Sequence, residues 1–150
     1  MGETYFIFFL RGVLDLVEGM NIKTHKLADM KLLGTPRYIV DDSEAFVELE
    51  TMEKMCIDET GLVHGGFSFC LADYAAMLAV NEPTVVLAEV KARFTAPVII
   101  GEKMTAHARV VEKDGRKRMV VVDVMVDDRK VMEGEFLCLI LREHILRRRT

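Results

Sequence analysis

The chain has 150 residues, 51% of them hydrophobic and 29% charged, which is a globular composition long enough to bury one core and too apolar for disorder. Its 20 basic and 24 acidic residues give a net charge of −4, so we expect no nucleic-acid partner. No apolar run approaches the roughly 20 residues of a membrane span, so we expect no membrane partner. Cys56, Cys70 and Cys138 have neither disulfide-framework nor zinc-site spacing, so we expect a cytoplasmic protein without a zinc site.

The first 35 residues are expected to form a helical extension. Apolar residues recur at helical spacing before Gly19, and they are Phe6, Phe9, Leu10, Val13, Leu14 and Val17. A second short helix is predicted over His25–Leu33, before Gly34-Thr35-Pro36. Met20-Asn21-Ile22 could equally be the natural start of the protein, and the sequence does not decide between these alternatives.

The period of the pattern then changes from helical to alternating, which indicates half-buried strands. Alternation is found in the Tyr38–Thr51 stretch and over 86–94, 104–110, 120–126 and 131–141. Asp114-Gly115 is a strong hairpin signal, and Asp127-Asp128 marks the next turn. Strands joined in series by tight turns favour an antiparallel sheet.

Between the first two predicted strands lies Gly65–Val80, whose small and apolar residues predict a helix buried on all sides. The economical arrangement is an α+β fold in which a curved antiparallel sheet wraps this one long helix, in the order β-α-β-β-β-β. We assign residues 36–141 to this domain and residues 142–150 to a basic, solvated tail.

Asp73 is the only charged residue from Gly65 through Asn81. Burial disfavours an ionised carboxylate, so the pKa of Asp73 should rise toward the range in which it can act as a base near neutral pH. A structural role, in which the carboxylate ties down neighbouring backbone, is equally compatible with the helix position.

His64-Gly65-Gly66 precedes the helix. The glycines allow close approach to the free N–H groups of the first turn, which suit a polarised carbonyl or an oxyanion. Alternatively, the two glycines only make the turn into the helix flexible, and His64 is a hydrogen-bonded structural histidine.

Gly65 and Asp73 are eight residues apart, which is about 12 Å along a helix. One reacting carbonyl cannot touch both groups of one chain. If the two act together, a two-fold dimer must supply glycine donors from one chain and Asp73 from the other.

Residues 61–81, GLVHGGFSFCLADYAAMLAVN, resemble the signature of the PaaI-like hotdog-fold acyl-CoA thioesterases, with an acid nine positions after the histidine. Phe94 and Pro97, followed by Gly101-Glu102, are similar to that family's strand end and turn. The resemblance spans about residues 36–141.

The resemblance implies a hotdog fold of five or six strands and a homodimer, with dimers pairing into tetramers. It implies that Gly65 polarises a thioester carbonyl, that Asp73 of the opposite subunit activates water or attacks directly, and that coenzyme A leaves without any cofactor. Two positions depart from the family: Asp58 stands where Asn is frequent, and Leu87 where a hydroxyl can orient water. A second carboxylate near Asp73 would raise one pKa further.

Lys91 and Arg93 share a strand face and could meet coenzyme A phosphates, or could be an ordinary solvated face. Cys70 has no local histidine and is expected to be a core thiol. The leading hypothesis is acyl-CoA hydrolysis with Asp73 as base or nucleophile, Gly65 and Gly66 as donors, and His64 and Asp58 in support. The alternatives are an acyl-CoA sensor module without catalysis and a hotdog hydratase or dehydratase.

Overall fold

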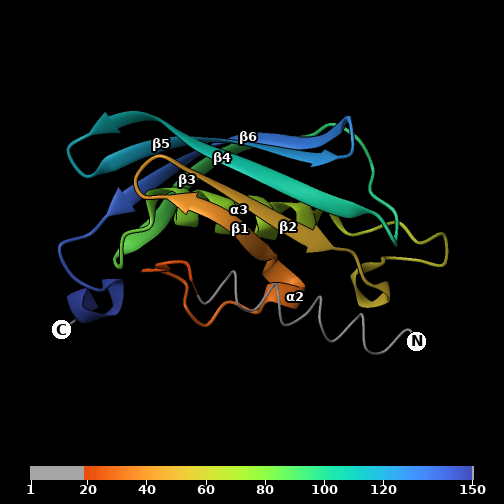
Figure 1. The fold of residues 1–150 in the computed structure, drawn as a ribbon, viewed down its shortest axis with the longest axis horizontal. Helices are drawn as coiled ribbons and strands as arrows, with labels where there is room; N and C mark the ends of the chain where they lie inside the picture. Colours follow the sequence, from red (N-terminus) through yellow and green to blue (C-terminus); the bar gives the residue numbers. More distant parts are fainter. Residues whose placement is uncertain (1–18, 150) are drawn as a thin grey trace.

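The computed structural model describes residues 19–149 of the chain (Figure 1). A six-stranded antiparallel sheet in the order β1-β2-β4-β5-β6-β3 curves around one main helix, α3. The strands are β1 (Thr35–Val40), β2 (Glu44–Glu50), β3 (Val85–Phe94), β4 (Lys103–Asp114), β5 (Lys117–Val126) and β6 (Arg129–Ile140). The helices are α2 (Met30–Leu33), α3 (Gly65–Val80) and the short 3-10 turns η1 (Glu53–Met55) and η2 (Ile145–Arg149). This is the predicted hotdog architecture.

Tight turns hold the meander β4-β5-β6 in register. Gly115 turns β4 into β5 with φ of 54°, and Asp127 turns β5 into β6 with φ of 49°. Both are left-handed conformations that glycine and aspartate tolerate better than most residues. The two hairpin signals of the sequence are therefore confirmed.

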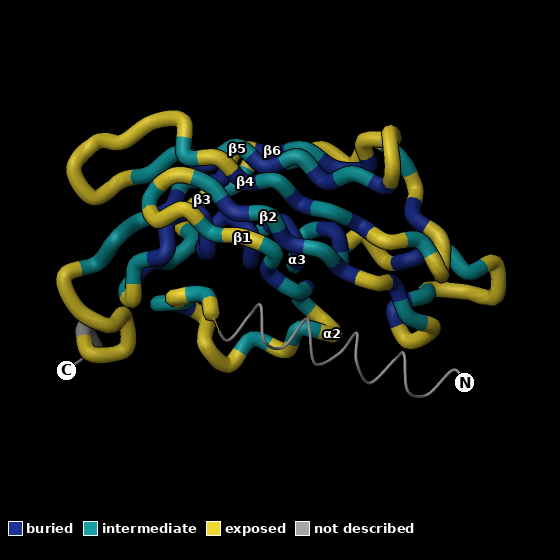
Figure 2. Tube along the Cα trace, viewed as in Figure 1, coloured by how far each residue is buried: buried dark blue, intermediate teal, exposed yellow. Residues whose placement is uncertain are grey.

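The core lies between the concave face of the sheet and α3 (Figure 2). Along β5 the valines at alternate positions are buried against the helix, and they are Val120, Val122, Val124 and Val126. From Leu71 to Val80 every residue of α3 except Asp73 is buried, so the helix meets apolar neighbours on almost every side. The predicted helix is confirmed with the same bounds as the apolar segment, but burial on all sides holds only from Leu71 onward, because Gly65 is exposed and most of residues 66–70 are half-buried.

Two expectations for the N-terminal half were wrong. The stretch from Tyr38 to Thr51 contains a hairpin of β1 and β2, so the order is β-β-α-β-β-β-β. Pro36 lies inside β1, which is possible because β1 is an edge strand and is bulged between Pro36 and Tyr38. The helix expected over His25–Leu33 is present only as α2, one turn capped by the Asp29 side chain. The helix expected over 6–17 lies outside the described residues.

Residues 19–34 run along α3 on the side away from the sheet (Figure 1). Asn81, fully buried at the end of α3, fixes this segment to the helix. Its side-chain amide donates to the Asn21 carbonyl and the Asp41 carboxylate, each at 2.8 Å, and its oxygen accepts from the Lys23 backbone N–H at 2.9 Å. Asn81 also takes the left-handed conformation, with φ of 51°, that ends the helix.

We expect Asn81→Gly to lower the free energy of unfolding by about 2 kcal/mol, because glycine keeps the left-handed backbone but leaves the Lys23 N–H and the Asn21 carbonyl without their partner. Chemical denaturation measures the change, with the exposed-site variant Glu59→Ala as control. Equal stability of Asn81→Gly and Glu59→Ala would contradict this account of the segment.

Candidate active site

The start of α3 is built around the His64 ring. His64 is the N-cap, and its Nδ1 accepts a hydrogen bond from the Gly66 N–H at 2.8 Å. The neutral ring therefore carries its proton on Nε2. A side chain at Gly66 would collide with that ring, since a Cβ there would lie 2.8 Å from Nδ1. Gly66 was expected to offer a second free donor, and this is wrong within the subunit because His64 already occupies its N–H.

The Gly65 N–H remains unpaired among the described residues. Gly65 is exposed at the positive end of the helix dipole, which favours a partially negative oxygen. It borders a cavity of about 370 Å³ whose other lining residues are Val63, Ser68, Phe94, Thr95, Ala96, Pro97 and Val98. The Phe94 ring lies over the glycine, at 3.3 Å from where a Cβ would be. The glycine thus leaves a donor open toward a mostly apolar cavity.

Asp73 lies half-buried two turns further along α3. Its Oδ1 is buried and has no hydrogen-bond partner among the described residues. Burial raises the pKa of Asp73 to about 6, as expected from its isolation. Burial also raises the pKa of the Cys70 thiol and that of Cys138, the latter to about 12, with the charge of Asp73 adding to both. Both thiols therefore resist ionisation, which disfavours a nucleophilic role for either cysteine.

The structure brings His64, Gly65 and Gly66 together and leaves Asp73 apart from them. An unbroken helix separates Gly65 from Asp73, so the two stay about 12 Å apart along its axis. Leu87, which pairs with Cys138 across β3 and β6, offers no hydroxyl near the carboxylate. The Gly65 N–H and the Asp73 carboxylate of one subunit therefore cannot contact the same atom of a bound molecule.

The β3 edge of the sheet is uncovered in the described subunit. β3 is the last strand of the sheet and pairs only with β6 in the described chain. Ala92 and Phe94 pair with Gly134 and Met132, which are buried on the concave face, yet Ala92 is half-buried and Phe94 is 58% exposed. The strand thus presents both unpaired backbone groups and uncovered apolar side chains beside the Gly65 cavity.

Asp58 lies away from Asp73 in an exposed loop. Its carboxylate accepts from the Thr60 N–H at 2.9 Å and from the Thr60 hydroxyl at 2.5 Å, and these bonds hold its pKa below the ordinary value. The expectation that Asp58 would raise the pKa of Asp73 is not met within the subunit, where burial is the cause of that shift. Asp58 shapes the loop that leads toward α3.

Lys91 and Arg93 point to the convex face of the sheet, away from α3. They line a hollow of about 450 Å³ together with Val121, Asp123, Glu133, Gly134 and Glu135. Arg93 pairs with Glu133, and Lys91 stands opposite Glu135 in the ladder. Three carboxylates beside two cations do not favour a coenzyme A phosphate in this hollow.

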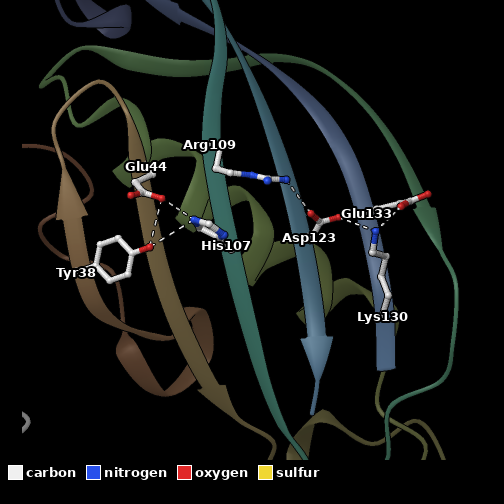
Figure 3. A network of polar contacts seen from close by, with 7 residues as sticks. All are labelled: Tyr38, Glu44, His107, Arg109, Asp123, Lys130 and Glu133. Atoms are coloured by element: carbon white, nitrogen blue, oxygen red, sulfur yellow. Dashed lines mark hydrogen bonds and ion pairs between the residues drawn. The ribbon is translucent and has the colours of Figure 1, made fainter. Parts of the chain in front are cut away.

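Positive and negative side chains also pair with one another across the neighbouring strands of the convex face (Figure 3). Glu44 accepts from His107 at 2.7 Å and from the Tyr38 hydroxyl at 3.3 Å, and Lys130 contacts both Asp123, at 3.0 Å, and Glu133, at 2.9 Å. The seven residues in the figure are Tyr38, Glu44, His107, Arg109, Asp123, Lys130 and Glu133. Positive and negative side chains on this surface are thus paired with one another.

Sequence reasoning missed Ser68, which is 4% exposed and lines the cavity beside Gly65. The available signal was a lone serine in the first turns of an otherwise apolar helix. Within residues 19–149 no group of His, Cys, Asp or Glu side chains could hold a metal ion, and the three cysteines are free. None of the helices in that range is long and apolar enough to cross a membrane.

A sequence profile of the Thioesterase superfamily matches residues 60–134, which include α3, β3, β4, β5 and the first half of β6. The crystal structure of the uncharacterized protein PH1136 from Pyrococcus horikoshii is similar, with a TM-score of 0.83 and 51% identity over 85% of this chain and 97% of that one. A mutant of the phenylacetic acid degradation protein PaaI from Thermus thermophilus has a TM-score of 0.67 and 27% identity, covering 75% of this chain and 97% of its own.

Curated relatives are longer proteins of mixed function. The chain is 45% identical over 122 residues to a methylthioribose-1-phosphate isomerase of Aquifex aeolicus, matching 81% of this chain and 26% of that protein. It is 27% identical over 101 residues to the transcription factor FapR of Caldanaerobacter subterraneus subsp. tengcongensis, matching 67% of this chain and 50% of FapR. The chain thus spans a half or less of these relatives. On the family profile and the fold, it belongs to the thioesterase superfamily and, within it, to the PaaI-like hotdog proteins.

Proposed function

We propose that the protein hydrolyses acyl-CoA thioesters at a site shared between two copies of the chain. The observation that carries this proposal is the separation, on one helix, of an unpaired donor at Gly65 from an unpaired buried carboxylate at Asp73. Two antiparallel copies of α3 would bring each Gly65 opposite the partner's Asp73. A two-fold axis then creates two identical sites.

In this site the Gly65 N–H would bind the thioester carbonyl oxygen and stabilise the negative charge that develops there. Asp73 of the partner subunit would take a proton from water as the water oxygen bonds to the carbonyl carbon. The C–S bond of the resulting tetrahedral intermediate then breaks, and coenzyme A leaves as a thiol with the proton that Asp73 returns. His64 positions Gly65 by holding the next N–H of the turn. A carboxylate with a pKa of about 6 is suited to this transfer near neutral pH.

Assembly through the open edge of β3 supports this arrangement. Pairing of two β3 edges would extend the sheet, cover Phe94 and place the two copies of α3 side by side. We extend the proposal to a cytoplasmic homodimer that can pair again into a tetramer. The three free cysteines fit a reducing compartment.

A second candidate function is acyl-CoA sensing without hydrolysis. The similarity to FapR, a transcription factor, favours this candidate because FapR shows that a regulator can contain a related domain. The buried, unpaired carboxylate of Asp73 favours hydrolysis instead. Burying it lowers the stability of the fold, and a base for catalysis explains this cost, whereas ligand binding alone does not need the group. Tight acyl-CoA binding with no thiol release would establish the sensor.

We expect Asp73→Asn to abolish most thiol release from an acyl-CoA panel, with turnover lower by about 10²-fold or more, because the base is lost. The melting temperature at pH 8 should not fall, because the charge that burial disfavours is removed as well. Thiol detection and thermal unfolding measure the two effects. Undiminished turnover in Asp73→Asn would remove Asp73 from the mechanism.

The pH dependence of the wild type should follow the ionisation of Asp73. The base must be ionised, so kcat/KM rises as the pH increases through about 6 and levels off above it. Because the pKa is raised on folding, ionisation of Asp73 lowers stability between its unfolded pKa and about 6, which opposes the rise in activity. A thiol-release profile from pH 4.5 to 8.5 that stays flat around pH 6 would contradict this assignment.

Gly65 permits a matched test of its N–H. Gly65→Pro removes the donor at the first helical position, which proline tolerates, and His64 already has the extended conformation (φ −60°, ψ 130°) that a residue before proline requires. Gly65→Ala adds a Cβ against the same Phe94 ring and keeps the N–H. We expect turnover to fall by about 10²-fold in Gly65→Pro and far less in Gly65→Ala.

Mixing the two inactive variants tests whether the site is shared. In a random mixture of Gly65→Pro and Asp73→Asn subunits, about half of the dimers are mixed and each has one site with both groups intact. Activity should therefore return to about a quarter of the wild-type value after mixing through reversible dissociation. If mass spectrometry shows mixed dimers but activity does not recover, the complete site must lie within one chain, and the shared site is rejected.

A further inference from the structure

We infer that Ser68 supplies a second hydrogen-bond donor to the substrate carbonyl oxygen, beside the Gly65 N–H. This inference rests on the proposed function and names a further residue of the same site. It follows from how the donors at the beginning of α3 are already used.

Within the described part of the chain, the first turn of α3 has a single backbone donor left free, the Gly65 N–H. The Gly66 N–H is bound by His64 Nδ1 at 2.8 Å, and the Phe67 N–H donates to the His64 carbonyl at 3.0 Å. Only the Gly65 N–H is left, whereas sites that stabilise an oxyanion usually direct more than one donor at it. A second donor therefore has to come from a side chain that borders the same cavity.

Two hydroxyl groups line this cavity, and one of them is occupied. The Thr95 hydroxyl donates to the Lys130 carbonyl at 2.7 Å, a normal strong acceptor. Among residues 19–149, the Ser68 hydroxyl has only the Met104 thioether sulfur as a partner, at 3.2 Å. A thioether is a weak acceptor, so the Ser68 hydroxyl can turn to a better one with little loss.

The position of Ser68 on the helix directs it toward Gly65. Residues three apart are neighbours on a helix surface, and side chains lean toward the helix N-terminus. Ser68 therefore leans back over the turn that begins at Gly65, and both line one cavity. With only 4% of its surface exposed, Ser68 would act where water competes little.

A carbonyl oxygen that enters between Gly65 and Ser68 would receive a backbone and a hydroxyl hydrogen bond. The bond from Ser68 becomes stronger as negative charge grows on the oxygen, so it acts more on the transition state than on the bound substrate. Around these donors the cavity is lined by Val63, Phe94, Ala96, Pro97 and Val98, which suit an apolar acyl group.

The test compares Ser68→Ala with Met104→Leu. Ser68→Ala removes the donor and should lower kcat by about 10²-fold with little change in KM. Met104→Leu removes the sulfur acceptor, keeps the serine and approximates the side-chain volume, so kcat should stay near the wild-type value. A purely structural role of the Ser68–Met104 contact predicts instead that both variants lose activity equally, and that result, or unchanged kcat in Ser68→Ala, would overturn the inference.

A spectroscopic measurement separates this inference from the proposed function. Acyl-CoA labelled with ¹³C at the carbonyl is bound to Asp73→Asn and to the double variant Asp73→Asn/Ser68→Ala, and the carbonyl stretch is recorded by difference infrared spectroscopy. Loss of a donor should move the stretch to higher frequency in the double variant. If the carbonyl stretch shifts but the wild type releases no thiol, Ser68 is a donor and the proposed hydrolysis is rejected. If the wild type releases thiol but the stretch is the same in both variants, the role of Ser68 alone is rejected.

Discussion

The half-buried Asp73 carboxylate, which has no hydrogen-bond partner within residues 19–149, is the constraint on which the proposed site depends. Nothing among the described residues hydrogen-bonds Oδ1 of Asp73, and burial alone raises its pKa to about 6. A buried unsatisfied acceptor lowers stability, and replacement by an apolar residue would relieve it. Its presence is understandable if a molecule outside the subunit completes its hydrogen bonds. Water and substrate in a shared cleft would do so.

In the first turn of the same helix, few hydrogen-bond donors remain free. His64 caps the helix with its ring and thereby uses the Gly66 N–H, so the expected pair of glycine donors is reduced to one. The same cap holds the turn rigid, and a rigid donor needs no reorganisation when charge develops in front of it. The helix end thus combines one fixed backbone donor with the weakly held hydroxyl of Ser68 beside it.

Much of the fold could be predicted from periodicity, because the signals were local. The buried helix at 65–80 and the hairpins at Gly115 and Asp127 followed from composition and turn chemistry. β1 was not predicted because Pro36 resembles a breaker, and only its edge position makes it acceptable in a strand. In the site, the raised pKa of Asp73 could be predicted, because Asp73 is the only charged residue of one apolar helix. The occupation of the Gly66 N–H and the weak partner of Ser68 could not, because they depend on side-chain directions and on contacts between distant residues.

The distribution of charge on the sheet indicates where a second copy can bind. On the convex face, Arg109, Asp123, Lys130 and Glu133 neutralise one another across neighbouring strands, and burying this network would require removing water from every member. On the concave side of β3, Phe94 is 58% exposed and the strand edge has unpaired backbone groups, so burial there removes apolar surface from water and satisfies hydrogen bonds. The β3 edge is therefore the better surface for the second copy that the proposed function requires. Because Phe94 and the residues that follow β3 line the Gly65 cavity, a second copy bound at this edge would lie beside that cavity, where the proposed function needs the partner's Asp73.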